Sequence, residues 1–446
     1  PTNSLHHQTI TIPNLDRDIY KLVESFQIFS GHIPLHKAWQ TRSTFNLGKT
    51  IARHVSAAKL TSKQIPTLLQ HAKMNANDRD IWNRAYAEEY NGLQSLPAWT
   101  SLSESEYQKI KHKIKTILPT MAISTIKYDQ NGAPKRAKYR IVALGNLDPH
   151  EWSKSDCYAP VMSLLELRLL TALAVKFKRC LKSGDVKQAF CQAVLPDNET
   201  YILRPPPGCL FTPKNTYWHL KRTLYGLKRS PRHWFEKAAS LLQQIGLKPC
   251  KHSPCIFKGH LIKDKAPIYL GLYVDDFVYF STDDSVEKYF EKQLSKLTNV
   301  DFMGQVSHFL GIKYQWKKHD KGYKVHMSQE SFADSLLEQT GLNELSVKTN
   351  PTPYRSGYPV DAIPINKSIS IQEQNKLTTQ YRSLIGSLLW LSQGTRPDLA
   401  TITNVLAKYQ SNPTQQHIDS AKFVIKYIKG TKYMGITFDT IADINL

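Results

Sequence analysis

Two adjacent aspartates, Asp275 and Asp276, interrupt an apolar run that extends from Ile268 to Phe280. β-branched and aromatic residues dominate on both sides of the pair, which predicts two buried strands. A two-residue separation indicates a tight hairpin turn, and Asp tolerates the backbone of such a turn. We therefore expect both carboxylates at the tip of a β-hairpin, where a divalent cation would offset the cost of burying their charge. An acidic surface turn is the alternative.

A third aspartate, Asp185, has a matching context. It ends a short extended segment after Gly184, and the chain is expected to turn helical behind it. An Asp at a strand end can meet the hairpin tip of a neighbouring strand. Two or three carboxylates that converge on a pair of Mg²⁺ ions are what in-line phosphoryl or nucleotidyl transfer requires. A lone Asp after a strand is usually a turn residue, so a catalytic role for Asp185 is supported only together with Asp275 and Asp276.

These segments resemble a known family. Tyr273-Val-Asp-Asp276 is similar to the Tyr-x-Asp-Asp box of reverse transcriptases, and Asp185-Val-Lys-Gln-Ala-Phe190 resembles their first catalytic motif. Further stretches resemble copia-type retrotransposon polyproteins in the same order, across roughly residues 78–438: Leu224-Tyr-Gly-Leu-Lys-Arg-Ser-Pro231, Phe309-Leu-Gly311, Tyr381–Trp390, Thr395-Arg-Pro-Asp398 and Tyr427-Ile-Lys-Gly-Thr431. Asp-Asp alone is a weak signal, whereas the ordered set is a strong one.

The resemblance implies a function, an RNA-directed DNA polymerase, and a role for each matching residue. It implies two Mg²⁺ ions, for which Mn²⁺ can substitute, with Asp185 and Asp275 as ligands, the Val186 carbonyl assisting and Asp276 as an outer ligand. It also implies a nucleotide site and a primer grip. The nucleotide site comprises Lys138, Arg140, Phe190, Tyr225 and Gly226, and the primer grip comprises Phe309, Leu310 and Gly311.

Within the nucleotide site, Phe190 is implied to lie beneath the sugar and to exclude a 2′-hydroxyl; an ordinary core position is the alternative. Lys138 and Arg140 lie on the second arm of a hairpin predicted from two strand-like runs, 122–128 and 138–144, around Asp129-Gln-Asn-Gly132. Cations on this arm suit the triphosphate of the incoming nucleotide, because the planar fork of Arg binds phosphate oxygens bidentately.

Composition agrees with a polyanionic partner. Lys and Arg number 59 against 37 Asp and Glu, a net charge of +22, and neutralised phosphates release counterions. The implied partners are an RNA template, a DNA or RNA primer, deoxynucleoside triphosphates, and the integrase and ribonuclease H modules of the same polyprotein. No membrane partner is expected, since no apolar run reaches transmembrane length. The six cysteines favour a reduced compartment. The implied location is the cytoplasm, within virus-like particles, with the nucleus as an alternative after reverse transcription.

The turn and loop residues between the expected strands and helices predict an α+β organisation. The resemblance implies a right-hand polymerase with fingers, an antiparallel palm sheet, a thumb and a helical C-terminal part. Residues 1–75 are expected to be a flexible linker, 76–322 fingers and palm, and 323–446 a thumb and connection-like region that ends before a ribonuclease H module. Ser163–Glu166 has the form of a capping box. Ser230-Pro231 is expected to open a helix, with Ser230 as N-cap, whose Trp234 stripe is core and which Gly246 stops.

One segment departs from the family pattern. Asn299–Gly304 lacks the Lys of a Met-Lys-Asp-Leu-Gly pattern, which leaves the general acid for pyrophosphate open, with Lys292 and Lys296 as weak substitutes. Copies of such elements often decay. A catalytically decayed, basic nucleic-acid-binding remnant of the same element is therefore the alternative function.

Overall fold

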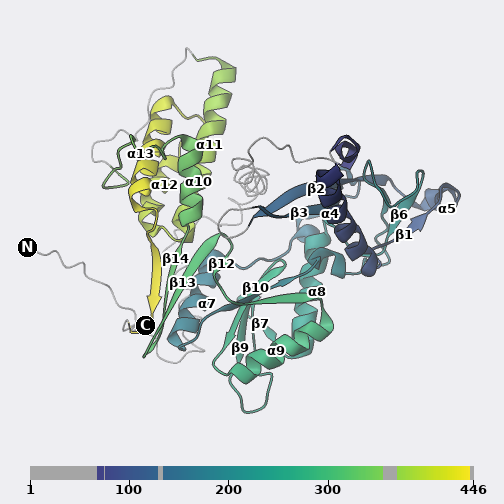
Figure 1. The fold of residues 1–446 in the computed structure, drawn as a ribbon, viewed down its shortest axis with the longest axis horizontal. Coiled ribbons are helices and arrows are strands. Elements are labelled where there is room, and N and C mark those ends of the chain that lie inside the picture. The colour runs from purple at the N-terminus through teal and green to yellow at the C-terminus, as the bar shows by residue number, and fades with distance from the viewer. Residues whose placement is uncertain (1–67, 75, 129–133, 355–368, 442–446) are drawn as a thin grey trace, which may run out of the picture. The chain divides into compact units, whose positions relative to one another are not determined.

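The computed structural model describes residues 68–74, 76–128, 134–354 and 369–441 (Figure 1). The expected linker 1–75 lies outside these ranges apart from 68–74, and the predicted turn Asp129–Gly132 lies outside them entirely. The chain divides into two compact units. Of the described residues, the aspartate-bearing unit contains those within Leu60–Leu170 and Leu181–Val306, and the C-terminal unit contains Thr171–Cys180 and those within Ser307–Leu446. Among the described residues, no helix combines the length and apolarity needed to span a bilayer.

Helices and strands alternate irregularly in the aspartate-bearing unit. Its described helices, with η marking 3₁₀ helices, are η1 (Leu68–Lys73), α4 (Ala76–Ser95), α5 (Glu104–Ile110), η2 (Lys111–Lys113), η3 (Gly145–Leu147), α6 (Lys154–Cys157), η4 (Ala189–Gln192), α8 (Ser230–Ile245) and α9 (Asp284–Leu297), and α7 (Leu164–Lys176) begins there and ends in the C-terminal unit. Its strands are β1 (Trp99–Leu102), β2 (Ile117–Tyr128), β3 (Pro134–Ala143), β4 (Lys182–Val186), β5 (Ile202–Arg204), β6 (Tyr217–Leu220), β7 (Lys248–Cys250), β8 (Ser253–Gly259), β9 (Ile268–Tyr273), β10 (Asp276–Ser281) and β11 (Val300–Gln305).

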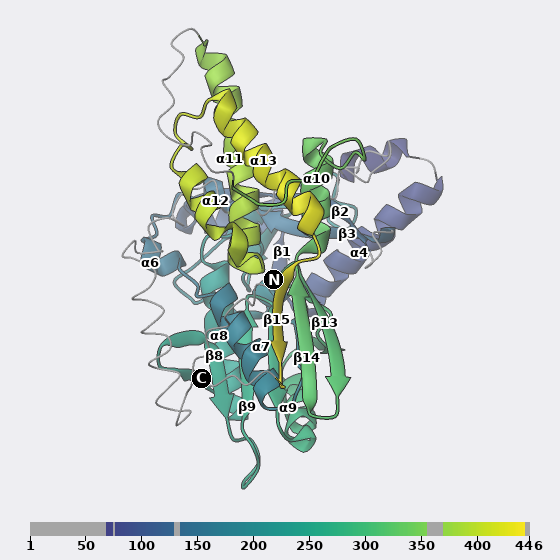
Figure 2. The same cartoon turned by 90° about the vertical axis from the view of Figure 1, so that its left-hand side faces the viewer.

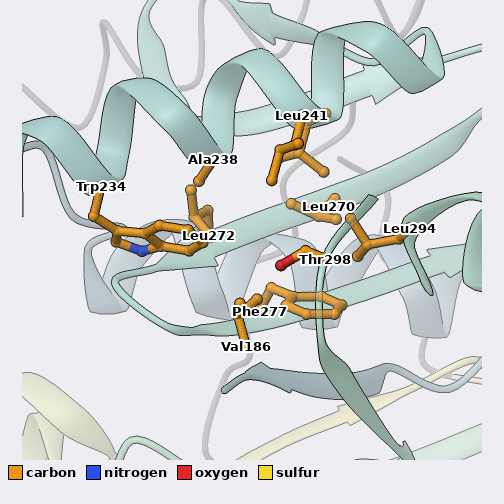
Figure 3. A pocket seen from close by; sticks show the side chains of 10 residues that line it. Val186, Trp234, Ala238, Leu241, Leu270, Leu272, Phe277, Leu294 and Thr298 are labelled. Atoms are coloured by element: carbon orange, nitrogen blue, oxygen red, sulfur yellow. The ribbon is translucent and has the colours of Figure 1, made fainter. Parts of the chain in front are cut away.

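A six-stranded antiparallel sheet carries the three aspartates. Its order is β11-β4-β10-β9-β8-β7, so the strand that contains Asp185 lies between β11 and β10. Helix α8 covers one face, and Trp234, Ala238 and Leu241 point from the helix toward Leu270 and Phe277 of the sheet (Figure 3). The predicted stripe of α8 is therefore core, and its burial supplies the hydrophobic stabilisation under the aspartates.

A second sheet, of order β1-β6-β5-β2-β3, lies in the same unit. β2 and β3 form the predicted long hairpin, in which Lys138 is opposite Thr125 and Arg140 is opposite Ile123. Helix α4 packs against β3. Its buried Trp82 and Tyr86 contact the ring of Tyr139, which points away from the face that carries Lys138 and Arg140 because strand side chains alternate.

The C-terminal unit joins a small sheet to a group of helices. The sheet has the order β12 (His308–Phe309), β13 (Ile312–His319), β14 (Gly322–Ser328), β15 (Gly435–Asp439). The helices are α10 (Glu330–Thr340), α11 (Ile371–Gly394), η5 (Pro397–Leu399), α12 (Ala400–Ala407) and α13 (Gln415–Thr431). α11 and α13 lie side by side (Figure 2), and their apolar faces share one core. The α+β class is confirmed, with antiparallel pairing throughout the described sheets except between β2 and β5, which pair in parallel.

Local helix signals were confirmed with one exception. The Glu166 carboxylate accepts the Ser163 amide N–H at 2.6 Å and the Ser163 hydroxyl accepts the Glu166 N–H at 3.2 Å, which is the predicted capping box. Gly246 ends α8 with φ 107. The prediction of Ser230 as N-cap was wrong: Arg229 is the N-cap. The Ser230 hydroxyl instead donates to the Leu224 carbonyl at 2.6 Å, which ties the helix to the preceding loop.

Candidate active site

The hairpin that carries the aspartate pair turns one residue earlier than predicted. Tyr273 pairs with Asp276, so Val274 and Asp275 form the two-residue turn and Asp276 begins β10. Val274 takes the left-handed φ of 57, which is costly for a β-branched residue. The expectation that both aspartates form the tip is corrected accordingly. Side chains alternate along a strand, so the one-residue offset changes which face Asp276 occupies.

The register places Asp276 directly opposite Asp185. Asp301 of β11 is opposite Asp185 on its other side. Directly opposite residues of an antiparallel pair share a face, so the three carboxylates form a row across three neighbouring strands. Burial and the adjacent Asp275 carboxylate raise the pKa of Asp185. Burial and the charges of Asp275 and Asp185 raise the pKa of Asp276 to about 7.

Two long-range contacts hold the strained turn in place, and a third fixes the end of β4 beside it. The indole N–H of Trp234 on α8 donates to the Val274 carbonyl at 2.6 Å. The Val186 amide at the end of β4 donates to the Asp275 carbonyl at 2.8 Å, and the Lys187 amide donates at 3.0 Å to the carbonyl of Asn299, just before β11. The backbones that carry Asp185 and Asp275 are thus bonded to each other directly, on rigid elements.

The carboxylates fit a hard divalent cation chemically. Carboxylate and carbonyl oxygens are the ligands that Mg²⁺ takes. Burial and repulsion from neighbouring carboxylates raise the pKa of Asp185 and Asp276, and a bound cation opposes both effects. In the described part of the chain, no three His, Cys, Asp or Glu side chains are already arranged as a ligand group. The register brings the donors to one end of three neighbouring strands.

Cations of the β2–β3 hairpin interact with these carboxylates. Lys127 acts electrostatically on both Asp185 and Asp276, and Lys138 acts on Asp185. Burial, followed by repulsion from Arg140 and Lys127, lowers the pKa of Lys138. Lys127 and Arg136 are opposite each other, with Lys138 and Arg140 at alternate positions of β3, so the four cations share one face. This basic face and the carboxylate row are chemically suited to a metal-bound polyphosphate.

Phe190 and Tyr225 lie together. Their rings meet edge to face with centroids 5.2 Å apart, and the Thr223 hydroxyl donates to the Phe190 carbonyl. Burial raises the pKa of the Tyr225 phenol above its ordinary range, which keeps it neutral. Gly226 has φ 96, and a Cβ there would collide with the Ala143 carbonyl at the end of β3. The close approach that needs Gly226 is therefore to the protein's own backbone, which joins this loop to the basic hairpin.

Lys228 and Arg229, which follow Gly226 in the motif Leu224–Pro231, bind other parts of the protein. The Lys228 ammonium donates to the Asp148 carbonyl at 2.9 Å. Arg229 pairs with the buried Glu199 and stacks over the Trp152 ring at 4.6 Å. These contacts anchor the loop that carries Tyr225 and Gly226, so its basic residues act as structural anchors.

Phe309, Leu310 and Gly311 form the turn of a small hairpin in the C-terminal unit. Phe309 pairs with Ile312, and Leu310 and Gly311 have φ 49 and 73, as a type I′ turn requires. A Cβ on Gly311 would lie 3.5 Å from the Trp390 ring of α11. Sequence reasoning selected the segment, and the structure shows that it is a hairpin turn supported by a helix of the same unit.

Sequence reasoning missed several residues of the site. They are Lys127, Asp301, the turn-holding role of Trp234, and Lys187, whose ammonium pairs with Asp301 at 2.7 Å. Asp301 stands in the segment that lacks the family's Lys, so that departure was the available signal. Trp234 was recognised as core, but only the fold brings its indole N–H to Val274, forty positions along the chain.

Comparisons with known proteins define the class. Residues 108–354, more than half of the chain, match the family model described as reverse transcriptase (RNA-dependent DNA polymerase). The chain therefore belongs to the reverse transcriptase family.

Curated relatives narrow the class to transposon polyproteins. The chain is 29% identical over 399 residues to the retrovirus-related Pol polyprotein from transposon RE1 of Arabidopsis thaliana, covering 89% of the chain and 25% of the relative. It is 26% identical over 337 residues to the corresponding polyprotein from transposon TNT 1-94 of Nicotiana tabacum, covering 74% of the chain and 24% of the relative. The chain spans about a quarter of the length of these relatives.

Proposed function

We propose that this chain is an RNA-directed DNA polymerase of a copia-type retrotransposon, which adds deoxynucleotides to a primer 3′-hydroxyl by two-metal nucleotidyl transfer. One observation carries the proposal: in a chain of the reverse transcriptase family, the strand register opposes Asp185 to Asp276 and bonds the Asp275 turn to the end of β4. Carboxylates on rigid neighbouring strands are suited to nucleotidyl transfer, because positioning supplies much of the rate.

The aspartates are the proposed metal ligands. Two Mg²⁺ ions, or Mn²⁺ in their place, supply activation of the attacking hydroxyl and stabilisation of the leaving oxygen when bound. Asp185 and Asp275 would hold them with the Val186 carbonyl, and Asp276 would sustain the local negative potential as an outer ligand. The raised pKa of Asp276, about 7, is consistent with a group that is not fully charged without a cation beside it.

Further residues of the chain are assigned to the nucleotide and to the primer. Lys138 and Arg140 bind the triphosphate oxygens, and the interaction of Lys138 with Asp185 supports that role. Phe190 lies beneath the sugar, steadied by the Tyr225 ring, and selects deoxynucleotides. Tyr225 and Gly226 face the nucleotide and the templating base. The turn Phe309–Gly311 positions the primer end.

We assign residues 76–322 to fingers and palm and 323–446 to a thumb and connection-like region. The partners are an RNA template, a DNA or RNA primer and deoxynucleoside triphosphates, recognised through backbone and shape. Integrase and ribonuclease H modules would belong to the same polyprotein, and the reaction would take place in cytoplasmic virus-like particles, with the nucleus as the alternative after reverse transcription.

Primer extension on a defined RNA template with Mg²⁺ or Mn²⁺ tests the proposal. We expect Asp185→Asn and Asp275→Asn each to abolish nucleotide addition while folding and primer–template binding persist, because each removes a ligand without adding bulk. Asp320→Asn is the control, since the Asp320 side chain is 87% exposed and belongs to the C-terminal unit; it should retain extension. Binding of primer–template without extension by the wild type would instead establish the decayed remnant.

A further inference from the structure

A buried glutamate of helix α4 lies beside the nucleotide site. Glu89 is only 8% exposed and precedes the residues that match the family model. Its Oε1 accepts the Ile141 amide N–H on β3 at 3.2 Å. Ile141 directly follows Arg140, so this bond fastens α4 to the strand that carries both triphosphate cations.

The same carboxylate interacts with both cations. Burial raises the pKa of Glu89, and the Ile141 amide, Lys138, Arg140 and the Gln188 side chain act in the opposite direction. Lys138 and Arg140 repel each other, and the Glu89 carboxylate, which attracts both, opposes that repulsion. A buried carboxylate persists only with such partners.

Gln188 connects Glu89 to the catalytic motif. It lies between Asp185 and Phe190 in the left-handed conformation, with φ 49 and ψ 40, which is unfavourable for a residue other than Gly. Its side chain hydrogen-bonds to the Glu89 carboxylate. A Cβ on Gly92, one helical turn beyond Glu89, would lie 2.5 Å from Gln188 Nε2, so the amide fills the space that Gly92 leaves. Helix α4 therefore fixes the kink from which the chain proceeds to Phe190.

We propose that Glu89 is a positioning residue of the nucleotide site, which holds Lys138 and Arg140 in place for the triphosphate and, through Gln188, orients the turn that carries Phe190. This inference rests on the proposed function and extends it to a helix outside the matched family region. If Glu89 merely neutralised the cations, its removal would free them and strengthen nucleotide binding. A positioning role predicts the opposite sign.

The test compares Glu89→Ala, Glu89→Gln and the control Glu88→Gln. Glu88 is the neighbouring residue; it pairs with Arg136 of the same hairpin at 3.0 Å, but its side chain is 67% exposed. We expect Glu89→Ala to weaken nucleotide binding about tenfold, with an unchanged Kd for primer–template and a smaller change in kcat. Glu89→Gln should recover most of the loss, because an amide oxygen can still accept the Ile141 N–H, and Glu88→Gln should match the wild type.

Equilibrium binding of a deoxynucleoside triphosphate to the protein on a dideoxy-terminated primer–template separates this inference from the proposed function. Loss of binding in Glu89→Ala supports the positioning role even if the wild type does not extend primers. Should Glu89→Ala fail to fold, Gln188→Ala, which removes the same link from the other side, takes its place with the same expected weakening. Unchanged or tighter nucleotide binding in the folded variant, or no binding by the wild type, overturns the inference.

Discussion

Replacing Trp234 with Phe isolates the hydrogen bond that holds the aspartate turn. The change removes the indole N–H that donates to the Val274 carbonyl at 2.6 Å and leaves an aromatic ring in the core under the sheet. Loss of the partner of a buried carbonyl costs roughly 1–3 kcal/mol. The smaller ring adds a volume term of about 1 kcal/mol. Val274, at φ 57, is free to relax once its carbonyl is released, which displaces Asp275.

We expect Trp234→Phe to lower the free energy of unfolding by about 2–4 kcal/mol and kcat of primer extension by up to about 100-fold, the effect of a displacement near 1 Å. Denaturant unfolding and steady-state extension measure the two effects. Trp218→Phe is the matched control. Trp218 is fully buried, and among the described residues its indole nitrogen has no hydrogen-bond partner, so the same atoms are removed without loss of a bond.

The control should lose only packing energy and should keep kcat. Equal losses of kcat in the two variants would show that general core packing, and not the bond to Val274, maintains the turn. A wild-type kcat in a destabilised Trp234→Phe would show that the turn keeps its geometry without the indole. Either result would refute the reasoning.

Three further predictions concern other parts of the chain. Phe190→Val should keep much of the deoxynucleotide activity and improve ribonucleotide incorporation, read as the ratio of the two kcat/KM values; an unchanged ratio would make Phe190 a core residue. The pKa of Asp276, about 7 in the folded protein, exceeds the unfolded value near 3.9. In EDTA the free energy of unfolding should therefore fall as pH rises between about 4 and 7, by ~2 kcal/mol because coupled carboxylates share the effect. Asp276→Asn should flatten this profile. If the slope persists in the variant, a group other than Asp276 causes it. Arg396, only 2% exposed, donates to the Asp398 carboxylate at 3.0 and 2.8 Å and to the Thr431 carbonyl at 2.9 Å. Because Lys cannot make this forked set of bonds, Arg396→Lys should lower the free energy of unfolding by about 3 kcal/mol. A wild-type melting curve for the variant would contradict that role.

The Arg396 network also explains two motifs that sequence reasoning could only match to a family. Thr395–Asp398 and Tyr427–Thr431 meet because Arg396 reaches Thr431 and the Tyr427 hydroxyl donates to Asp398 at 2.9 Å. These hydrogen bonds join the start of η5 to the end of α13. The motif residues are thus accounted for by folding of the C-terminal unit.

Local patterns were enough to predict the elements around the aspartates. The apolar arms of 268–280 predicted the β9–β10 hairpin, Ser163 and Glu166 predicted the capping box of α7, and Gly246 predicted the end of α8. Each signal depends on residues within one or two turns of each other, so local sterics and hydrogen bonding decide it. The order of the family motifs supplied the function in the same way, because motif spacing is a property of the chain.

Tertiary packing decided what the local patterns left open. The apolar run suits a turn at either of two offsets, and pairing with β4, together with the Trp234 bond to Val274, selects the offset that sets Asp276 opposite Asp185. Asp301 joins the row only because β11 lies beside β4. Glu89 reads as one polar position of an amphipathic helix until α4 packs on β3. Such contacts join residues far apart in the chain, and their free energies depend on burial and register that no short segment contains.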